Sequence, residues 1–367
     1  MSENLPVLSQ RKKQILYSAV DNYIKVANPI TSSFIQNAEL KDTSTATIRN
    51  ELSSLEAMGY LKQLHTSSGR VPTTKGYRFF VNEILANLNY TQNELCTVKD
   101  ELFLKSNNLS EIVRSIADTI SQKTNYPAVV VFDGFKELMV KSIKIFYLIS
   151  GQLLVLVETN AGVVTNTITA SSTIESKDCE DASNLFNSMF AGKSIGYLME
   201  NINSFSEKVS RELDKYKELF KLVLIVLENY TKSASDVQSG GLVKLLNSPE
   251  YSDVEKAKDI LNVLSDKTKL KDIFDTKSEE GVEVKLGDEL DNEKLNDCAV
   301  ITTPLVIDGK KIASIGVIGP ERIDYASIAS ALKIIADEIN ERRSNKDKGG
   351  GWLYGTRQRK NRTKTNC

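Results

Sequence analysis

The stretch that most constrains the fold of this chain is residues 43–59, T-S-T-A-T-I-R-N-E-L-S-S-L-E-A-M-G. Its apolar residues recur at a helical period, which predicts a helix with one buried face. That face consists of Ile48, Leu52, Leu55 and Met58. Thr43 or Ser44 can cap the start of the helix, and a glycine such as Gly59 is typical of a helix end.

The opposite face of this helix is small, polar and singly charged. Arginine pairs with guanine and asparagine with adenine in the major groove of DNA, so such a helix suits that groove. An ordinary amphipathic surface helix is the alternative for this stretch alone. The predicted DNA contacts on the helix are Thr45, Thr47, Arg49 and Asn50.

The residues before this helix predict two further helices with short joints. Residues 9–26 form the first, with Ser9 as its cap, and Asn28-Pro29 separates it from a short second helix that ends near Ala38. Three such helices make a helix-turn-helix arrangement. Basic residues in the first turn predict contact with DNA phosphates, although a solvated basic turn fits equally well; they include Arg11 and Lys12.

The residues after this helix predict a two-stranded hairpin. Residues 60–64 and 69–73 flank a Ser/Gly turn, which is typical of the wing of a winged helix. Wings lie along the DNA backbone or reach into the minor groove, where arginine is favoured. Lys62, His65 and Arg70 are the predicted wing contacts. His65 is the only histidine, so a hydrogen bond or phosphate contact is favoured over catalysis.

The charge distribution supports a DNA-binding end. The 367 residues carry a net charge of −1, but residues 1–90 hold 10 Lys/Arg against 7 Asp/Glu, residues 91–343 hold 30 against 40, and residues 344–367 hold 7 against 1. A basic end on an acidic remainder fits a nucleic-acid-binding domain joined to one that stays off the DNA. The glycine-rich and basic tail is expected to be disordered, either as a species-specific or vector-derived extension or as a DNA-contacting tail.

The composition also bounds the class of protein. No apolar run is long enough to cross a bilayer, and the first residues lack the pattern of a signal peptide, so we expect a cytoplasmic protein without membrane contact. The four cysteines are far apart and form no C-x-x-C pair, which predicts neither a zinc site nor a disulfide framework. We expect no bound metal.

The second part of the chain predicts strands interrupted by helices. β-branched runs at 127–132, 142–149, 152–158 and 163–168 predict an antiparallel sheet, and a later pair at 298–304 and 311–318 is joined by Asp308-Gly309. A helix from Tyr325 to Arg343 follows. Helical periodicity from about 173 to 274 separates the two groups, which indicates one sheet domain with an insertion.

Several motifs together resemble one protein family. The first is S-x-x-T-I-R-N-E-L-x-x-L-E-x-x-G-x-L from Ser44 to Leu61, followed by H-T-S-S-G-R-V-P-T-x-K-G-Y-R-F-F-V from His65 to Val81. P-E-Y-S-D-V-E-K at 249–256 and I-G-P-E-R-I-D-Y-A-S-I-A-S-A-L at 318–332 extend the likeness. The chain resembles the family of the heat-inducible transcription repressor HrcA over almost its whole length.

The resemblance implies an α+β fold in which a winged helix-turn-helix domain precedes a GAF-like antiparallel sheet domain with an inserted helical dimerisation domain. The expected limits are 1–86 for the winged helix, 87–172 and 276–343 for the two parts of the GAF-like domain with its linker helix, 173–275 for the insertion and 344–367 for the tail. It also implies a chaperone-operon inverted repeat as target, release on heat stress, and the chaperonin as a further partner.

No motif for catalysis or cofactor binding stands out. A-G-K-S at 191–194 lacks the glycine of a phosphate-binding loop, because Asn187 occupies that position, and no G-x-S-x-G, H-E-x-x-H or G-x-G-x-x-G occurs. We therefore predict a homodimeric repressor of heat-shock operons, not an enzyme, without a cofactor. The alternatives are a metabolite-responsive winged-helix repressor whose GAF-like domain binds a small effector, and an interaction module whose winged helix binds protein.

Overall fold

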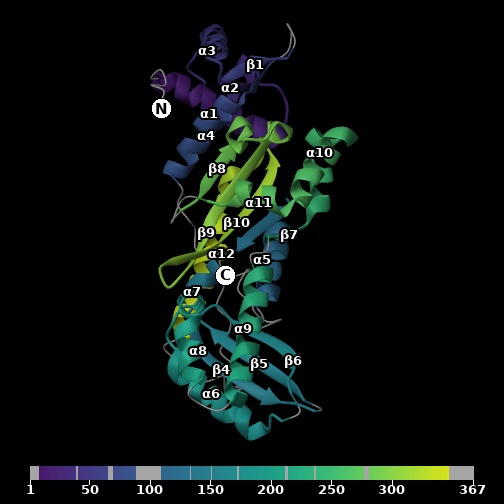
Figure 1. Cartoon of the computed structure of the whole chain (residues 1–367). Coiled ribbons are helices and arrows are strands. Elements are labelled where there is room, and N and C mark those ends of the chain that lie inside the picture. The colour runs from purple at the N-terminus through teal and green to yellow at the C-terminus, as the bar shows by residue number, and fades with distance from the viewer. Residues whose placement is uncertain are drawn as a thin grey trace, which may run out of the picture.

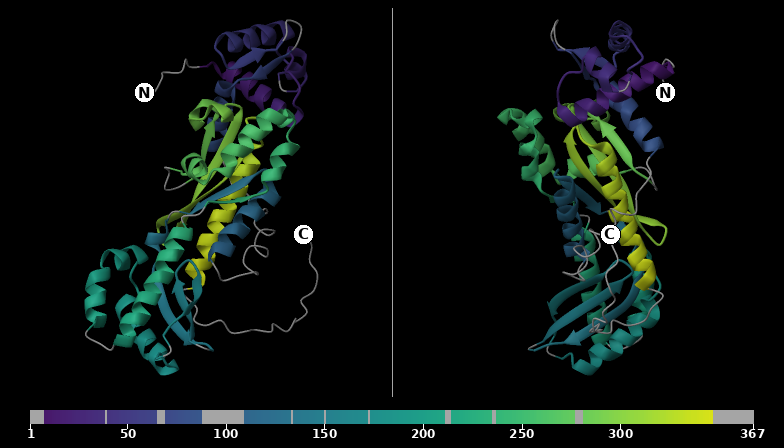
Figure 2. Two further views of the ribbon diagram at one scale, coloured as in Figure 1. Left: turned by 45° about the vertical axis from the view of Figure 1, so that its right-hand side comes forward. Right: turned by 180° about the vertical axis from the view of Figure 1, so that it is seen from behind.

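The computed structural model of the chain describes residues 8–38, 40–64, 69–87, 109–132, 134–149, 151–171, 173–210, 214–234, 237–276 and 281–346. Over these residues the molecule is elongated, with a winged helix at one end, a five-stranded sheet in the middle and a three-stranded sheet at the other end (Figures 1 and 2). We call these parts the head (8–87), the body (109–138 and 237–346) and the lobe (139–234).

The head is a three-helix unit with a short hairpin and a fourth helix. Its elements are α1 (Gln10–Val26), α2 (Ser32–Ala38), α3 (Thr45–Ala57), β1 (Leu61–Gln63), β2 (Arg70–Pro72) and α4 (Thr74–Ala86). Ser9 accepts a hydrogen bond from the N–H of Lys12 at 3.3 Å and caps α1, as predicted. Ser44 caps α3 by accepting from the N–H of Thr47 at 3.1 Å. Of the two predicted capping residues, Ser44 is therefore the one used.

The back of α3 is buried as its periodicity predicted. Ile48, Leu52 and Leu55 are at most 1% exposed and pack against α1 and α2, whereas Met58 is only partly buried. Gly59 follows the helix with φ +78°, a conformation that glycine adopts without strain. Burial of one face fixes which residues α3 presents to solvent.

The body is organised around one antiparallel sheet with the strand order β7-β3-β10-β9-β8. The strands are β3 (Ala128–Phe132), β7 (Val237–Gly240), β8 (Glu283–Leu286), β9 (Cys298–Ile307) and β10 (Lys310–Pro320). The predicted hairpin at Asp308-Gly309 joins β9 to β10, and both residues have positive φ, as such tight turns require. An antiparallel sheet is present as predicted, but of the predicted strands it contains only those at 127–132, 298–304 and 311–318.

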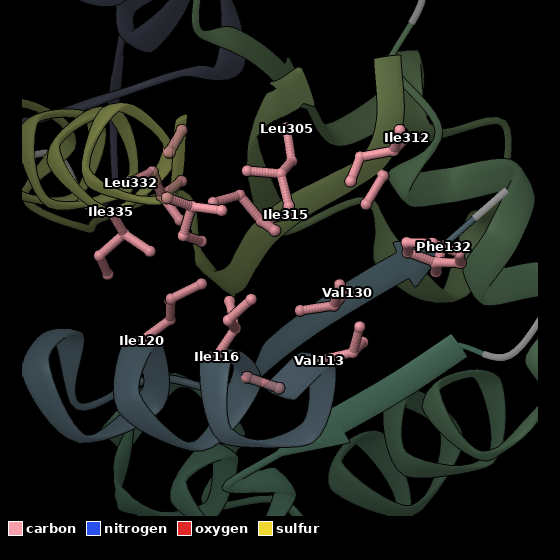
Figure 3. Close-up of a cluster of buried hydrophobic side chains, with 14 of the residues drawn as sticks. Val113, Ile116, Ile120, Val130, Phe132, Leu305, Ile312, Ile315, Leu332 and Ile335 are labelled. Atoms are coloured by element: carbon pink, nitrogen blue, oxygen red, sulfur yellow. The ribbon is translucent and has the colours of Figure 1, made fainter. Parts of the chain in front are cut away.

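Helices cover both faces of the body sheet. They are α5 (Leu109–Thr124) and α12 (Tyr325–Lys346) on one face, and α10 (Val254–Ser265) and α11 (Lys267–Phe274) on the other. Figure 3 shows Val130 of β3 and Ile315 of β10 facing Ile116 of α5 and Leu332 of α12. Val129 and Val131 alternate with Val130 along β3, so their side chains point to the opposite face of the sheet. There they pack in the same buried cluster as residues of α10 and α11. Burial on both faces explains why the inner strands β3, β9 and β10 are mostly apolar.

The lobe is a second sheet with its own helices. Its elements are β4 (Val140–Tyr147), β5 (Gln152–Thr159), β6 (Val163–Thr169), α6 (Ser176–Phe190), α7 (Ile195–Glu200), α8 (Ile202–Ser210) and α9 (Asp214–Ala234). Side chains of α6 satisfy the edge of β4: Ser183 Oγ accepts from the N–H of Ile145 at 3.0 Å, and Asn187 Oδ1 from the N–H of Ile143 at 2.6 Å. That edge is therefore closed to further strand pairing.

The strand order corrects the predicted division of the chain. Three of the strands expected in the GAF-like sheet, at 142–149, 152–158 and 163–168, form the separate sheet of the lobe. The expected insertion at 173–275 is also not one helical block, because α10 and α11 pack on the body. The insertion in the structure runs from β4 to α9. Alternation of apolar residues predicts strands but cannot say which strands pair.

The head packs directly on the body. Tyr325 of α12 is 1% exposed, and its ring centroid lies 6.4 Å from that of Tyr77 and 6.4 Å from that of Phe80, both on α4. Arg78 of α4 donates from Nε to Glu289 Oε1 at 2.9 Å and from a terminal nitrogen to the carbonyl of Val284 at 2.9 Å. The buried apolar cluster therefore continues from the head into the body.

A second contact between head and body involves a buried acid. The carboxyl of Glu321, which follows β10, lies near the side chain of Thr74, the first residue of α4. Gly287 lies beside both, because a Cβ there would stand 3.2 Å from Thr74 Cγ2 and 3.3 Å from Glu321 Oε1. Burial raises the pKa of Glu321 to about 7; the nearby Thr74 side chain and Lys62 act to lower this pKa, while Asp297 and Asp288 act to raise it.

The packing of the short 3-10 helix η3 (Leu242–Asn247) on the α10 side of the body can be tested with two neighbouring leucines. Leu245 is fully buried and Leu246 is 52% exposed. Leu245→Ala should lower the free energy of unfolding by about 2–5 kcal/mol, and the matched Leu246→Ala by no more than about 0.5 kcal/mol. Urea unfolding of the full chain measures both. Equal effects would contradict the packing of η3 against the body.

The acid at the head–body contact predicts a pH dependence. Because the pKa of Glu321 is raised from 4.5 to about 7 in the folded protein, its contribution to stability is complete below pH 4.5 and is lost as the pH rises to about 7. Glu321→Gln should therefore raise the melting temperature relative to the wild type at pH 8 and change it little near pH 4.5. Glu293→Gln, at an exposed position, is the control and should follow the wild type at both pH values. A Glu321→Gln effect that does not change with pH would refute this assignment.

Candidate nucleic-acid interface

The exposed side of α3 forms a continuous strip of small and polar residues. We call it the recognition front; it consists of Ser44, Thr45, Ala46, Arg49, Asn50 and Ser53, all exposed. α3 lies at the end of the molecule opposite the lobe, so neither body nor lobe covers the front (Figure 1). A helix of this composition at an open end can enter the major groove of DNA.

The predicted base contacts on α3 do not all occupy equivalent positions. Thr45, Arg49 and Asn50 are exposed on the recognition front, as expected. Thr47 is half-buried, and its hydroxyl lies 2.9 Å from the hydroxyl of Ser44, the capping residue. Thr47 therefore takes part in the cap, and its hydroxyl has one hydrogen-bonding partner within the helix before any ligand is bound.

The acids of α3 are paired with cations of the head. Glu51 Oε2 lies 3.7 Å from Lys12 Nζ, and Glu56 Oε2 accepts from Arg70 Nε at 2.8 Å. Within the described part of the head Arg49 has no carboxylate within 4.0 Å, and its side chain is exposed. The positive charge of Arg49 is thus free to act on a ligand, while the negative charges beside it are compensated.

Arg70 is turned away from solvent. It is predicted as a wing contact to DNA, along the backbone or in the minor groove, and in the structure its side chain is only 13% exposed and turns back onto α3. Besides Glu56, it donates to Ser53 Oγ at 2.9 Å. Arg70 therefore fixes the wing strand β2 to the recognition helix. Sequence reasoning missed Ser53, although its position four residues after Arg49 places it on the same helix face.

The remaining predicted DNA contacts are Arg11 and Lys12 of α1 and Lys62 and His65 of the wing. Arg11 is exposed in the first turn of α1, whereas Lys12 is partly buried by its ion pair with Glu51. Lys62 is exposed on β1, yet it is close enough to Glu321 to lower the pKa of that acid, which places it toward the body. His65 lies outside the residues that the structure describes.

Two pairs of buried polar groups in the body are hydrogen-bonded to each other. Ser314 Oγ accepts from the N–H of Thr276 at 3.3 Å, and the hydroxyl of Tyr251 lies 3.2 Å from the sulfur of Cys298. Burial raises the pKa of the Cys298 thiol to about 11, which disfavours the thiolate that a nucleophile needs. Among the described residues, no cluster of His, Cys, Asp and Glu could hold a metal ion. Likewise, none of the described helices is long and apolar enough to cross a membrane.

Comparison with known proteins identifies the family. The model of the winged helix-turn-helix DNA-binding domain of the HrcA transcription repressor matches residues 7–85, and the model of the HrcA protein C-terminal domain matches residues 110–329. The chain belongs to the HrcA family of heat-inducible transcription repressors. The function of the family is DNA-binding repression and not catalysis, in agreement with the prediction from the sequence.

Relatives in the HrcA family match nearly end to end. The heat-inducible transcription repressor HrcA of Acetivibrio thermocellus is 33% identical over 338 residues, which cover 91% of this chain and 96% of the relative. That of Pelotomaculum thermopropionicum is 32% identical over 339 residues, with the same shares covered. A crystal structure described as that of a hypothetical protein has the same fold, with a TM-score of 0.66 at 20% identity, covering 92% of this chain and 99% of that one.

The recognition front leads to a direct test. If Arg49 pairs with a base, Arg49→Ala should weaken specific DNA binding by about 1–3 kcal/mol and leave binding to random duplex nearly unchanged. Equal losses on both duplexes would instead show that Arg49 contacts a phosphate. Lys25→Ala removes an exposed cation of the head at the far end of α1 and should leave both affinities close to the wild type. Fluorescence anisotropy at fixed salt concentration measures these affinities.

Proposed function

We propose that the chain acts as a homodimer that represses chaperone operons by binding an inverted repeat. The observation that carries this proposal is the recognition front, on which Arg49 and Asn50 lie exposed on a capped helix with a buried back. Two such heads related by twofold symmetry would read two half-sites about one or more helical turns apart. The site of action would be the cytoplasm, where promoter DNA lies.

We assign dimerisation to the lobe. The hairpin between β4 and β5 exposes four consecutive apolar residues, Phe146, Tyr147, Leu148 and Ile149, and Ile149 is 84% exposed. Elsewhere on the lobe, Ile225 of α9 is 44% exposed, although Phe220 and Val223 of the same helix are buried. Clustered exposed apolar side chains favour an interface, since their burial against a second copy removes them from water.

The resemblance to the family supports two regulatory proposals. Heating would release the repressor from its operator, as the name of the relatives indicates for those proteins. The chaperonin would maintain the active form. Addition of purified chaperonin to heat-inactivated protein should then restore operator binding, and an unchanged bound fraction would refute this second proposal.

Footprinting of the purified protein over the chaperone promoters of its own chromosome tests the main proposal. We expect protection of an inverted repeat, with an affinity whose log-log dependence on salt has a slope of about 0.9 per phosphate neutralised. Failure of the folded protein to prefer the repeat over scrambled sequence would refute it. A shift in melting temperature on addition of a small metabolite would favour the metabolite-responsive alternative instead.

The dimer assignment predicts an effect of charge in the lobe. Phe146→Asp and Ile149→Asp should each give monomers in analytical ultracentrifugation, because an aspartate would be buried without a partner at the interface. Binding to a single half-site should stay unchanged, while binding to the inverted repeat falls. The matched control is Val243→Asp, at a 75% exposed apolar position of the body. Dimers that persist in both lobe variants would contradict the assignment.

A further inference from the structure

Two motifs that the recognition front does not use meet at the junction of head and body. Glu250 belongs to P-E-Y-S-D, in the turn η4 (Pro249–Tyr251), and Arg322 belongs to G-P-E-R-I-D-Y, between β10 and α12. Arg322 donates from Nε to Glu250 Oε1 at 2.7 Å and from a terminal nitrogen to the carbonyl of Ile24 at 3.0 Å. One side chain of the body thus joins another segment of the body to helix α1 of the head.

A positively charged hydrogen-bond donor is favourable at the C-terminal end of a helix. The last carbonyls of a helix have no partner within it, and the helix dipole makes that end negative. The carbonyl of Ile24 lies in the last turn of α1 and receives its hydrogen bond from a cation. Glu250 holds the same guanidinium from another direction, and the two side chains are only 20% and 28% exposed. A planar guanidinium with two acceptors fixes an angle, which the flexible ammonium of lysine does not.

The head has other attachments that do not depend on Arg322. The aromatic packing of Tyr77 and Phe80 on Tyr325 is buried, and Arg78 forms its own contacts with Glu289 and Val284. Loss of Arg322 should therefore leave the head folded and attached, while α1 loses its connection to the body through that side chain. The contact is placed to control orientation more than attachment.

We propose that Arg322 is a positioning residue that sets the angle of the DNA-binding head on the body, and thereby the spacing of half-sites that the dimer can read. The inference rests on the proposed function, because it needs two heads on one operator. In the elongated molecule the head and the lobe lie at opposite ends (Figures 1 and 2), so a small rotation at the junction displaces the recognition front of each protomer relative to its partner's.

Binding to duplexes of altered spacing tests the proposal. The probes are the inverted repeat found by footprinting, the same repeat with its spacer changed by about one to three base pairs, and a single half-site. The wild type should lose about 100-fold in affinity when the altered spacer prevents both heads from binding. Arg322→Ala and Arg322→Lys should reduce this discrimination to less than about tenfold while half-site binding stays unchanged. Lys256→Ala, which breaks an ion pair with Asp297 on the body, is the control and should keep the wild-type spacing preference.

A distance measurement keeps the test independent of DNA. Spin labels at Lys41→Cys in the head and Val243→Cys in the body, both exposed positions, would be placed in the full chain with Cys96 and Cys367 replaced by serine. With Arg322 intact, we expect one narrow distribution of distances between the two labels. In Arg322→Ala we expect a broader distribution. An unchanged distribution, an unchanged spacing preference, or an equal loss on half-site and repeat would overturn the proposal. Failure of the wild type to bind any repeat would refute the proposed function, and the distance measurement would still decide the role of Arg322.

Discussion

The packing of two α4 aromatic residues against Tyr325 is the interaction on which the arrangement of the molecule depends. Tyr77 and Phe80 are buried against a tyrosine that begins the long helix α12, and α12 in turn covers one face of the body sheet. Apolar burial is not directional, so it holds the head without fixing its rotation. Hydrogen bonds supply direction, because donors and acceptors must align, and both Arg78 and Arg322 form such bonds between head and body.

At the α3 side of the head, ion pairs join α3 to its neighbouring elements. Lys12 and Arg70 neutralise the two acids of α3, and Arg70 also binds Ser53. These contacts make the wing and α1 parts of the scaffold that holds α3. The side chains left for a nucleic acid are therefore fewer than the count of basic residues in the head suggests. Arg49 combines exposure, position and charge most completely.

Local chemistry made much of this structure predictable. The caps at Ser9 and Ser44 and the turn at Asp308-Gly309 depend on residues close in sequence, and the structure has each where it was expected. Pairing of distant strands depends on which apolar faces meet, so the strands from 142 to 168 were assigned to the wrong sheet. Arg70 shows the same limit for a single side chain, because its partner Glu56 lies on another element and the sequence does not indicate that the two side chains meet.

The lobe leaves and re-enters the body at two adjacent strands. β3 ends where β7 begins, since Val131 pairs with Val237 across the antiparallel ladder, and everything from β4 to α9 lies between them. Among the described residues, the strands of the body pair with one another and not with a strand of the lobe, and Asn160 of the lobe donates a side-chain hydrogen bond to Asp308 in the turn between β9 and β10. A module inserted in this way can be lengthened or reshaped without disturbing the register of the sheet that carries it.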